Sequence, residues 1–284
     1  MNKLIINPTG GLANRMRFIA AALTLAKDLG IEYRIVWLSN WEIGATFEQV
    51  FEMPTELSEL IEYPSTITYG LLYSIPRKKN FYLSALSRRR FALTLNDLSS
   101  PLADILRKDC SDNNIRQMIG KIKSERDILI QGGTNIYSYS ENFYRKLFKL
   151  KAELQQSVDK VIGELGQNIV GVHIRRTDNI MSINNSPDSF FERAMLKELE
   201  NEPSTKFYLA TDSENVKARF KMKFGNKIAV SSSVARRDTI EGIKNAAIEL
   251  FILARTSKIF GSFYSSFSEA AAMLGNTPLV ILKN

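Results

Sequence analysis

From residue 168 onward, short apolar strands alternate with helices, and this alternation constrains the fold more than any other feature. The sequence predicts strands at residues 168–174, 206–210, 227–230, 258–260 and 279–282, with helices at 187–200, 214–224, 239–254 and 267–274. Such alternation builds a parallel sheet covered on both faces. Because ligands bind beyond the carboxyl ends of such strands, the residues just after each strand are the candidates for function.

The first part of the chain predicts a second α/β domain. A strand at residues 3–7, a turn, a helix at 14–29 and a strand at 33–38 form a βαβ unit, and a further strand is predicted at 127–131. Residues 40–123 show no repeat and include a tyrosine-rich loop at 64–73, and residues 141–165 predict one long helix. With 284 residues available, we expect two linked domains, 1–165 and 166–284.

The composition is that of an ordinary globular protein, with 44% apolar and 24% charged residues. The longest apolar run, residues 18–26, is too short to span a membrane, and residues 1–7 lack the pattern of a signal peptide. A single cysteine, Cys110, excludes an internal disulfide and a cysteine-rich zinc site. These features predict a cytoplasmic protein.

The chain is basic, with a net charge of +8. Its densest clusters are Arg77, Lys78 and Lys79, and Arg88, Arg89 and Arg90. We interpret them first as solvated surface, with peripheral contact to an anionic acceptor or membrane as the alternative. Neither cluster lies in a nucleic-acid-binding pattern, so we expect no nucleic-acid partner.

The most polar motif lies at the end of the strand predicted at residues 168–174. The strand period places His173, the only histidine of the chain, and Arg175 on one side, and Arg176 and Asp178 follow. Arginines at a buried strand end require anionic or hydrogen-bonding partners, and a guanidinium binds phosphate oxygens bidentately. The alternative is an internal salt bridge between Arg176 and Asp178, with His173 as a core residue.

Polar residues also follow the strand predicted at 206–210. Thr211 and Asp212 lie where they could share a crevice with the arginines, near a ribose or a sugar. Alternatively, Asp212 or Ser213 caps the next helix.

Two serines follow the strand predicted at 258–260. Ser266 and Glu269 have the spacing of a capping box, which predicts a helix start directly after the strand. The unpaired amides of a helix amino terminus favour a phosphate, and Ser265 and Ser266 add hydroxyl donors. An ordinary capped helix is the alternative.

A single carboxylate interrupts the apolar run at residues 246–254. Glu249 requires hydrogen-bond donors if it is buried there, and guanine offers two parallel ones. Alternatively, Arg255 or Lys244 neutralises this carboxylate, or it lies on a narrow solvated face.

Taken together, these segments resemble the carboxyl-terminal domain of α1,6- and nodulation-type fucosyltransferases. The signature His-x-Arg-Arg-x-Asp is matched in full by residues 173–178, and residues 210–212 and the run 237–266 resemble the second and third motifs of the superfamily. The loop at residues 10–15, which contains Asn14, resembles the first-strand loop of the wider group. The resemblance covers residues 168–275 well and 3–38 loosely.

This resemblance implies a GT-B-like fold of two Rossmann-type domains, an acceptor-side domain at 1–165 and a nucleotide-sugar domain at 166–284. It implies metal-independent, inverting transfer of fucose from GDP-fucose to a glycan hydroxyl, with no cofactor and no metal site. Arg175 and Asp178 take the catalytic roles. Donor contacts are implied for Asn14, His173, Arg175, Arg176, Thr211, Asp212, Glu249, Ser265 and Ser266.

The chain also departs from the family pattern. The α1,6 enzymes have a glutamate, the proposed base, where this chain has Ile183, and relatives have an aspartate at the position of Glu249. Asp188 and Glu192 are the next carboxylates after the motif, so the base is unassigned. Three alternatives therefore stay open: another nucleotide-sugar donor, a non-catalytic nucleotide- or glycan-binding protein, and, from charge alone, a nucleic-acid-binding protein.

Overall fold

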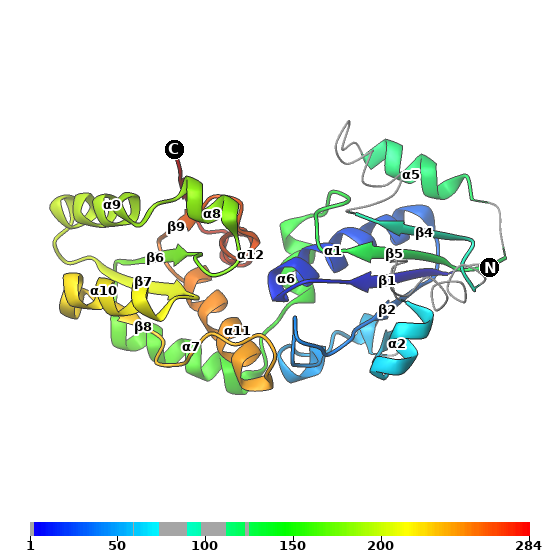
Figure 1. The fold of residues 1–284 in the computed structure, drawn as a ribbon, viewed down its shortest axis with the longest axis horizontal. Coiled ribbons are helices and arrows are strands. Elements are labelled where there is room, and N and C mark those ends of the chain that lie inside the picture. Colours follow the sequence, from blue (N-terminus) through cyan, green and yellow to red (C-terminus); the bar gives the residue numbers. More distant parts are fainter. Residues whose placement is uncertain (1–2, 59, 74–89, 98–111, 123–124) are drawn as a thin grey trace. The chain divides into compact units, whose positions relative to one another are not determined.

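The computed structural model describes residues 3–58, 60–73, 90–97, 112–122 and 125–284 (Figure 1). The chain divides into two compact units, Met1–Phe148 and Lys149–Asn284. Each unit contains one five-stranded sheet, and every described strand pair in both sheets is parallel. The predicted α/β class with two parallel sheets is therefore confirmed.

The sheet of the amino-terminal unit has the strand order β3-β2-β1-β5-β4. Its strands are β1 (Leu4–Pro8), β2 (Tyr33–Val36), β3 (Ile61–Glu62), β4 (Leu93–Asn96) and β5 (Ile128–Gly132). Its described helices are α1 (Leu12–Leu29), α2 (Thr66–Leu72), α5 (Asp112–Gly120), α6 (Glu141–Leu147) and the 3-10 turns Phe47–Gln49 and Thr55–Leu57. Helix α1 ends at Gly30, whose φ of 63° lies in the left-handed region that glycine adopts without strain.

Two predictions for this part of the chain are wrong. The loop predicted at 64–73 contains α2, and the helix predicted at 141–165 is broken into α6 and α7 (Ala152–Leu165). The break follows from tertiary packing: Phe148 leaves the helical conformation and its ring packs on those of Phe47 and Phe51 at 6.2 and 5.4 Å. Because α7 packs instead on α11 (Ile240–Ala254), the units divide after Phe148 rather than at the predicted residue 165.

The sheet of the carboxyl-terminal unit has the order β10-β9-β6-β7-β8, with β6 in the centre. The strands are β6 (Ile169–Ile174), β7 (Lys206–Thr211), β8 (Ile228–Val230), β9 (Lys258–Ser262) and β10 (Leu279–Leu282). The remaining helices are α8 (Ile180–Asn185), α9 (Asp188–Asn201), α10 (Glu214–Phe224), the 3-10 turn Gly225–Lys227 and α12 (Ser266–Gly275). All five predicted strands and four predicted helices are present within a few residues of their predicted bounds.

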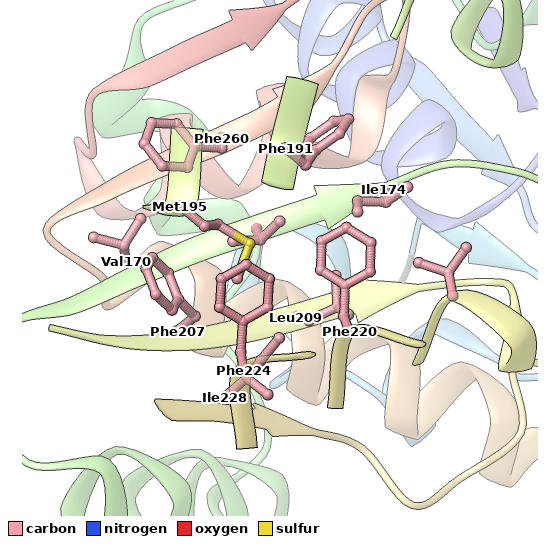
Figure 2. Packing of buried hydrophobic residues seen from close by; sticks show 12 residues of the cluster. Val170, Ile174, Phe191, Met195, Phe207, Leu209, Phe220, Phe224, Ile228 and Phe260 are labelled. Carbon is pink, nitrogen blue, oxygen red and sulfur yellow. The ribbon is translucent and has the colours of Figure 1, made fainter. Parts of the chain in front are cut away.

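One face of this sheet is covered by α9 and α10 (Figure 2). Alternate residues of β6, including Val170 and Ile174, point into this core. Phe191 and Met195 of α9 and Phe220 of α10 close over them and have no exposed surface. Apolar burial of this kind stabilises the position of β6, whose end carries the polar motif.

The opposite face of the sheet is covered by α11 and α12. A side chain at Gly171 of β6 would lie 2.9 Å from both Leu253 of α11 and Thr256, so glycine is required for this close approach. His173 shares the Gly171 side of the strand, as the strand period predicts, and its ring stacks on Phe267 of α12.

No helix in the described ranges has both the length and the hydrophobicity of a membrane span. Arg77, Lys78, Lys79, Arg88, Arg89 and Cys110, to which predictions were attached, lie outside the described residues. Arg90 is described, and its guanidinium lies 5.5 Å from the ring centres of both Tyr73 and Phe91.

The α9–α10 core predicts a large difference between two positions of α10. Phe220→Ala should lower the free energy of unfolding by about 3–5 kcal/mol, because it removes a fully buried ring. Met222→Ala, at a residue that is 84% exposed on the same helix, should change it by less than about 0.5 kcal/mol. Urea denaturation of both variants measures the difference, and equal losses would contradict this packing.

Candidate functional site at the carboxyl edge of the second sheet

The polar motif lies at the carboxyl edge of the second sheet, where the chain changes direction across it. From β6 the chain adds β7 and β8 on one side and returns to place β9 and β10 on the other. The ends of β6 and β9 are joined by Ser262, whose hydroxyl accepts from the Arg175 amide at 3.1 Å and donates to the His173 carbonyl at 3.2 Å. Ligands bind at such a switch point in open α/β sheets.

Asp212, directly after β7, organises the turn that follows β6. Its carboxylate accepts from the backbone amides of Arg176 and Thr177 at 2.8 and 3.3 Å, and from the Thr177 hydroxyl at 2.6 Å. It also pairs with the Arg175 guanidinium at 2.9 Å. Burial by itself raises the pKa of Asp212, but the guanidinium and the donated hydrogen bonds outweigh burial and hold that pKa below its usual value. The carboxylate is therefore charged at neutral pH.

Arg175 lies at the rim of the sheet between two carboxylates. Besides Asp212, its guanidinium contacts Asp178, and 19% of the side chain is exposed. Asp178 is 52% exposed and also pairs with Arg237 at 3.0 Å. The internal salt bridge that the sequence suggested therefore forms with Arg175 rather than with Arg176, and it leaves a guanidinium at the solvent edge.

Arg176 is directed into the protein. Its Nε donates to Asp188 at 2.7 Å, Nη1 donates to the Arg175 carbonyl at 2.7 Å, and Nη2 donates to the Ser186 carbonyl at 2.6 Å. Each guanidinium nitrogen thus has a protein oxygen as its partner. In this structure Arg176 stabilises the turn. Its guanidinium nitrogens bond to protein oxygens, and not to a position where the phosphate contact predicted from the sequence would form.

His173 is a buried, neutral residue. Its ring stacks on Phe267, with ring centres 4.9 Å apart and an angle of 30°. Burial first, and then the nearby arginines, lower the pKa of His173 to about 3. The unfolded chain therefore takes up this proton first, and stability is lost as the pH falls below about 6.5. Nδ1 is buried with no hydrogen-bond partner among the described residues, which leaves a free polar atom beneath the rim.

Glu249 lies on α11, on the face of the sheet that His173 also occupies. Burial raises the pKa of Glu249 to about 7, with Lys217 opposing the rise and Glu214 and Asp212 adding to it. The carboxylate also contributes to raising the pKa of buried Tyr208 on β7. Glu249 is therefore a carboxyl group held close to its titration point, as expected for a group that gains donors only when a ligand binds.

The two cations that the sequence suggested for Glu249 have other partners. Arg255 pairs with Asp159 at 2.8 Å, and Lys244 lies 3.5 Å from Glu241. The cation that acts on Glu249 is Lys217, which is almost fully buried on α10 and lowers the pKa of the Glu249 carboxyl group.

Helix α12 starts one residue earlier than the predicted capping box requires. Its N-cap is Ser265, which makes no side-chain capping bond, so the third helical residue is Ser268 and not Glu269. The Ser268 hydroxyl donates to the Ser265 carbonyl at 3.2 Å. The prediction of a Ser266–Glu269 capping box is wrong, whereas the helix start just after β9 is confirmed.

The remaining predicted donor residues differ in position. Thr211 is buried, and its hydroxyl accepts from the Ser213 amide at 3.4 Å, while Ser213 caps α10. Asn14 belongs to the first turn of α1 in the other unit, packed close to Gly10 and Gly133. The structure thus brings His173, Arg175 and the polar groups after β7 and β9 to one edge, and Asn14 is part of a separate unit.

Neither carboxylate that follows the motif in α9 is free to act as a base. Asp188 pairs with Arg176 and Arg219, and Glu192 pairs with Lys223 at 2.5 Å. Ile183, at the position of the glutamate in α1,6 enzymes, lies on α8 with 36% of its surface exposed. Within the described residues, no three His, Cys, Asp or Glu side chains gather as a metal site requires.

Sequence reasoning missed the contacts that hold the motif in place, which come from Ser262, Asp188 and Phe267. One signal was available for Asp188. It lies four residues before Glu192 on a predicted helix, and Arg219 and Lys223 have the same spacing on the next helix. Two acidic residues one turn apart on one helix, and two basic residues with the same spacing on the next, predict ion pairs between the helices.

The solved structures similar to this chain include fucosyltransferases. The crystal structure of fucosyltransferase NodZ from Bradyrhizobium has 18% sequence identity to this chain and a TM-score of 0.61, and the match covers 96% of this chain and 94% of that one. FUT1 of Arabidopsis thaliana in complex with GDP has 13% identity, a TM-score of 0.66 and covers 99% and 71%. POFUT1 in complex with GDP-fucose has 12% identity, a TM-score of 0.58 and covers 99% and 98%. Neither a protein-family model nor a curated protein matches the sequence.

The chain thus has the two-unit, GT-B-type α/β fold of the fucosyltransferase structures. At these identities the likeness establishes the fold. The activity has to be argued from the residues at the edge of the second sheet.

The raised pKa of Glu249 predicts a pH-dependent effect of its substitution. Because the folded state holds this proton more tightly, the wild type loses stability as the pH rises from about 4.5 to about 7. Glu249→Gln removes this loss. The difference in unfolding free energy between variant and wild type should therefore shift by about 2 kcal/mol in favour of the variant from pH 5 to pH 8. Denaturant titrations at both pH values measure it, and a constant difference would contradict the raised pKa of Glu249.

Proposed function

We propose that the protein transfers fucose from GDP-fucose to a hydroxyl group of a glycan acceptor, inverting the anomeric centre and using no metal ion. The observation that carries this proposal is Arg175, a permanently charged side chain held by Asp212 at the switch point of the second sheet. The fold supports it, since structures of this fold have been determined with GDP and GDP-fucose.

Arg175 is proposed to bind the β-phosphate of the donor. It contacts Asp178 at the solvent edge and Asp212 further in. An exposed ion pair contributes little stability, so a diphosphate can replace Asp178 at low cost. Asp212, which is only 10% exposed, keeps the guanidinium oriented meanwhile. Ser265 and Ser266, at the start of α12, are proposed as further phosphate donors.

The guanine base is proposed to lie at the carboxyl edge of the sheet, on the side that carries His173 and Glu249. The buried Nδ1 of His173 offers a neutral hydrogen-bonding atom, and Glu249 offers a carboxylate. Guanine has two adjacent donors, N1–H and the N2 amino group, that match one carboxylate. Their binding favours the charged form of Glu249 and lowers its pKa.

In the proposed reaction the acceptor hydroxyl attacks the anomeric carbon from the side opposite the diphosphate. The bond between that carbon and the β-phosphate oxygen breaks, and negative charge develops on the leaving GDP. Arg175 stabilises this charge because its position is fixed before the reaction starts. The hydroxyl proton goes to a base other than Asp188 or Glu192, because arginine and lysine side chains occupy both carboxylates.

The acceptor and the cellular location belong to the same proposal. We place acceptor binding in the amino-terminal unit, propose Asn14 of the first turn of α1 as a donor contact, and expect a cytoplasmic enzyme of polysaccharide biosynthesis. The basic clusters around residues 77–79 and 88–90 are proposed to contact an anionic acceptor or membrane surface.

Replacement of Arg175 tests the charge-stabilising role. Arg175→Ala should lower kcat for fucosyl transfer by about 10²–10³-fold, since it removes the fixed positive charge from the leaving group. Arg175→Lys keeps the charge but not the bidentate geometry and should recover only part of the rate. Transfer is followed as GDP release. Near wild-type turnover by a folded Arg175→Ala protein would reject the proposal.

A nucleotide panel separates the proposed donor from its alternatives. GDP should raise the melting temperature more than UDP, ADP or CMP, because only guanine satisfies Glu249, and ligands that bind only the folded state stabilise it. Excess chelator should leave both this shift and GDP-fucose turnover unchanged. A preference for another nucleotide, or turnover of GDP-mannose in place of GDP-fucose, would redirect the assignment to a different donor. GDP binding without hydrolysis or transfer would indicate a non-catalytic binding protein.

A further inference from the structure

We propose that Asp188 is a positioning residue that fixes the orientation of Arg175 by acting through Arg176. Asp188 is the first residue of α9 and lies outside the strand ends that form the rim. The inference rests on the fucosyl-transfer function proposed above, because it concerns how that site holds its phosphate-binding arginine.

The first step is the contact between Asp188 and Arg176. The carboxylate accepts from Nε of Arg176 at 2.7 Å and also contacts Nη2. Both side chains are largely buried, with exposed fractions of 19% and 14%. The pairing fixes the orientation of the Arg176 guanidinium, because its N–H groups point in fixed directions from a planar group.

The second step is the contact between Arg176 and the turn. With Asp188 holding one edge of the guanidinium, Nη1 and Nη2 donate to the carbonyl oxygens of Arg175 and Ser186. These two bonds fix the backbone of Arg175 relative to the start of α9. A shift of the Arg176 side chain therefore moves the residue that carries the proposed phosphate-binding group.

The third step is a set of ion pairs between α9 and α10, called here the ion-pair ladder, which Asp188 and Glu192 form with Arg219 and Lys223. Glu192 serves as a matched control for Asp188. Arg219 of α10 contacts Asp188 and lies 3.6 Å from Glu192, and Lys223 lies 2.5 Å from Glu192. Asp188 and Glu192 are one helical turn apart, have exposed fractions of 19% and 22%, and share Arg219 as a partner. They differ in that Asp188 also holds Arg176.

The test compares Asp188→Asn with Glu192→Gln in the full-length protein. Both changes remove one negative charge, keep the size of the side chain and weaken the same ladder. Asp188→Asn should lower kcat roughly 10- to 100-fold, because small displacements of a catalytic group cost that much, with a smaller change in KM for GDP-fucose. Glu192→Gln should keep kcat within about twofold of wild type. Asp188→Glu, which retains the charge, should recover part of the lost rate.

Thermal unfolding of all three variants separates positioning from stability. The inference requires that all three variants are folded at the assay temperature and that Asp188→Asn and Glu192→Gln differ in kcat. Equal kcat values in the two variants would overturn it and leave the fucosyl-transfer proposal intact, provided that wild type turns over and Arg175→Ala shows the large loss of kcat predicted above. A wild type that neither binds GDP nor consumes GDP-fucose would overturn the proposed function, and the inference with it.

Discussion

The arrangement of the site depends on one buried carboxylate, that of Asp212. It accepts hydrogen bonds from two consecutive amides and from the Thr177 hydroxyl, and it pairs with Arg175. A carboxylate with this many donors stays charged despite burial, because the donors compensate for the lost hydration. These contacts tie the turn after β6 to the end of β7, and Arg175 lies at the rim because Asp212 occupies the end of the neighbouring strand.

The two adjacent arginines of the motif have opposite tasks in this arrangement. Arg175 has two carboxylate neighbours, one of which is exposed, so an incoming anion can reach it. Arg176 has its donors satisfied by Asp188 and by two carbonyl oxygens. Arg176 thus helps to fix the position of Arg175. Of the two adjacent arginines, only Arg175 therefore presents its charge at the rim.

Much of the second unit could be predicted from the sequence, because strand period and helix period decide local structure where the core is apolar throughout. The same reasoning placed His173 and Arg175 on one side of β6 and Asp212 beside them. It failed where distant contacts decide the outcome. Phe148 ends α6 because its ring packs on residues some hundred positions earlier in the chain, and Asp188 becomes part of the site only because α9 starts beside the turn.

Burial decides which of the ionisable side chains at the site carry a charge. The charge therefore changes from the interior of the site to its rim. Beneath the rim His173 is neutral, and Glu249 has a pKa of about 7, since charging either group there costs hydration energy. At the rim Arg175 is charged and partly exposed. A ligand that spans both regions must be uncharged at its buried end and anionic at its outer end. A nucleoside diphosphate has this distribution, whereas a uniformly charged polyanion would meet an unfavourable buried region beside Glu249.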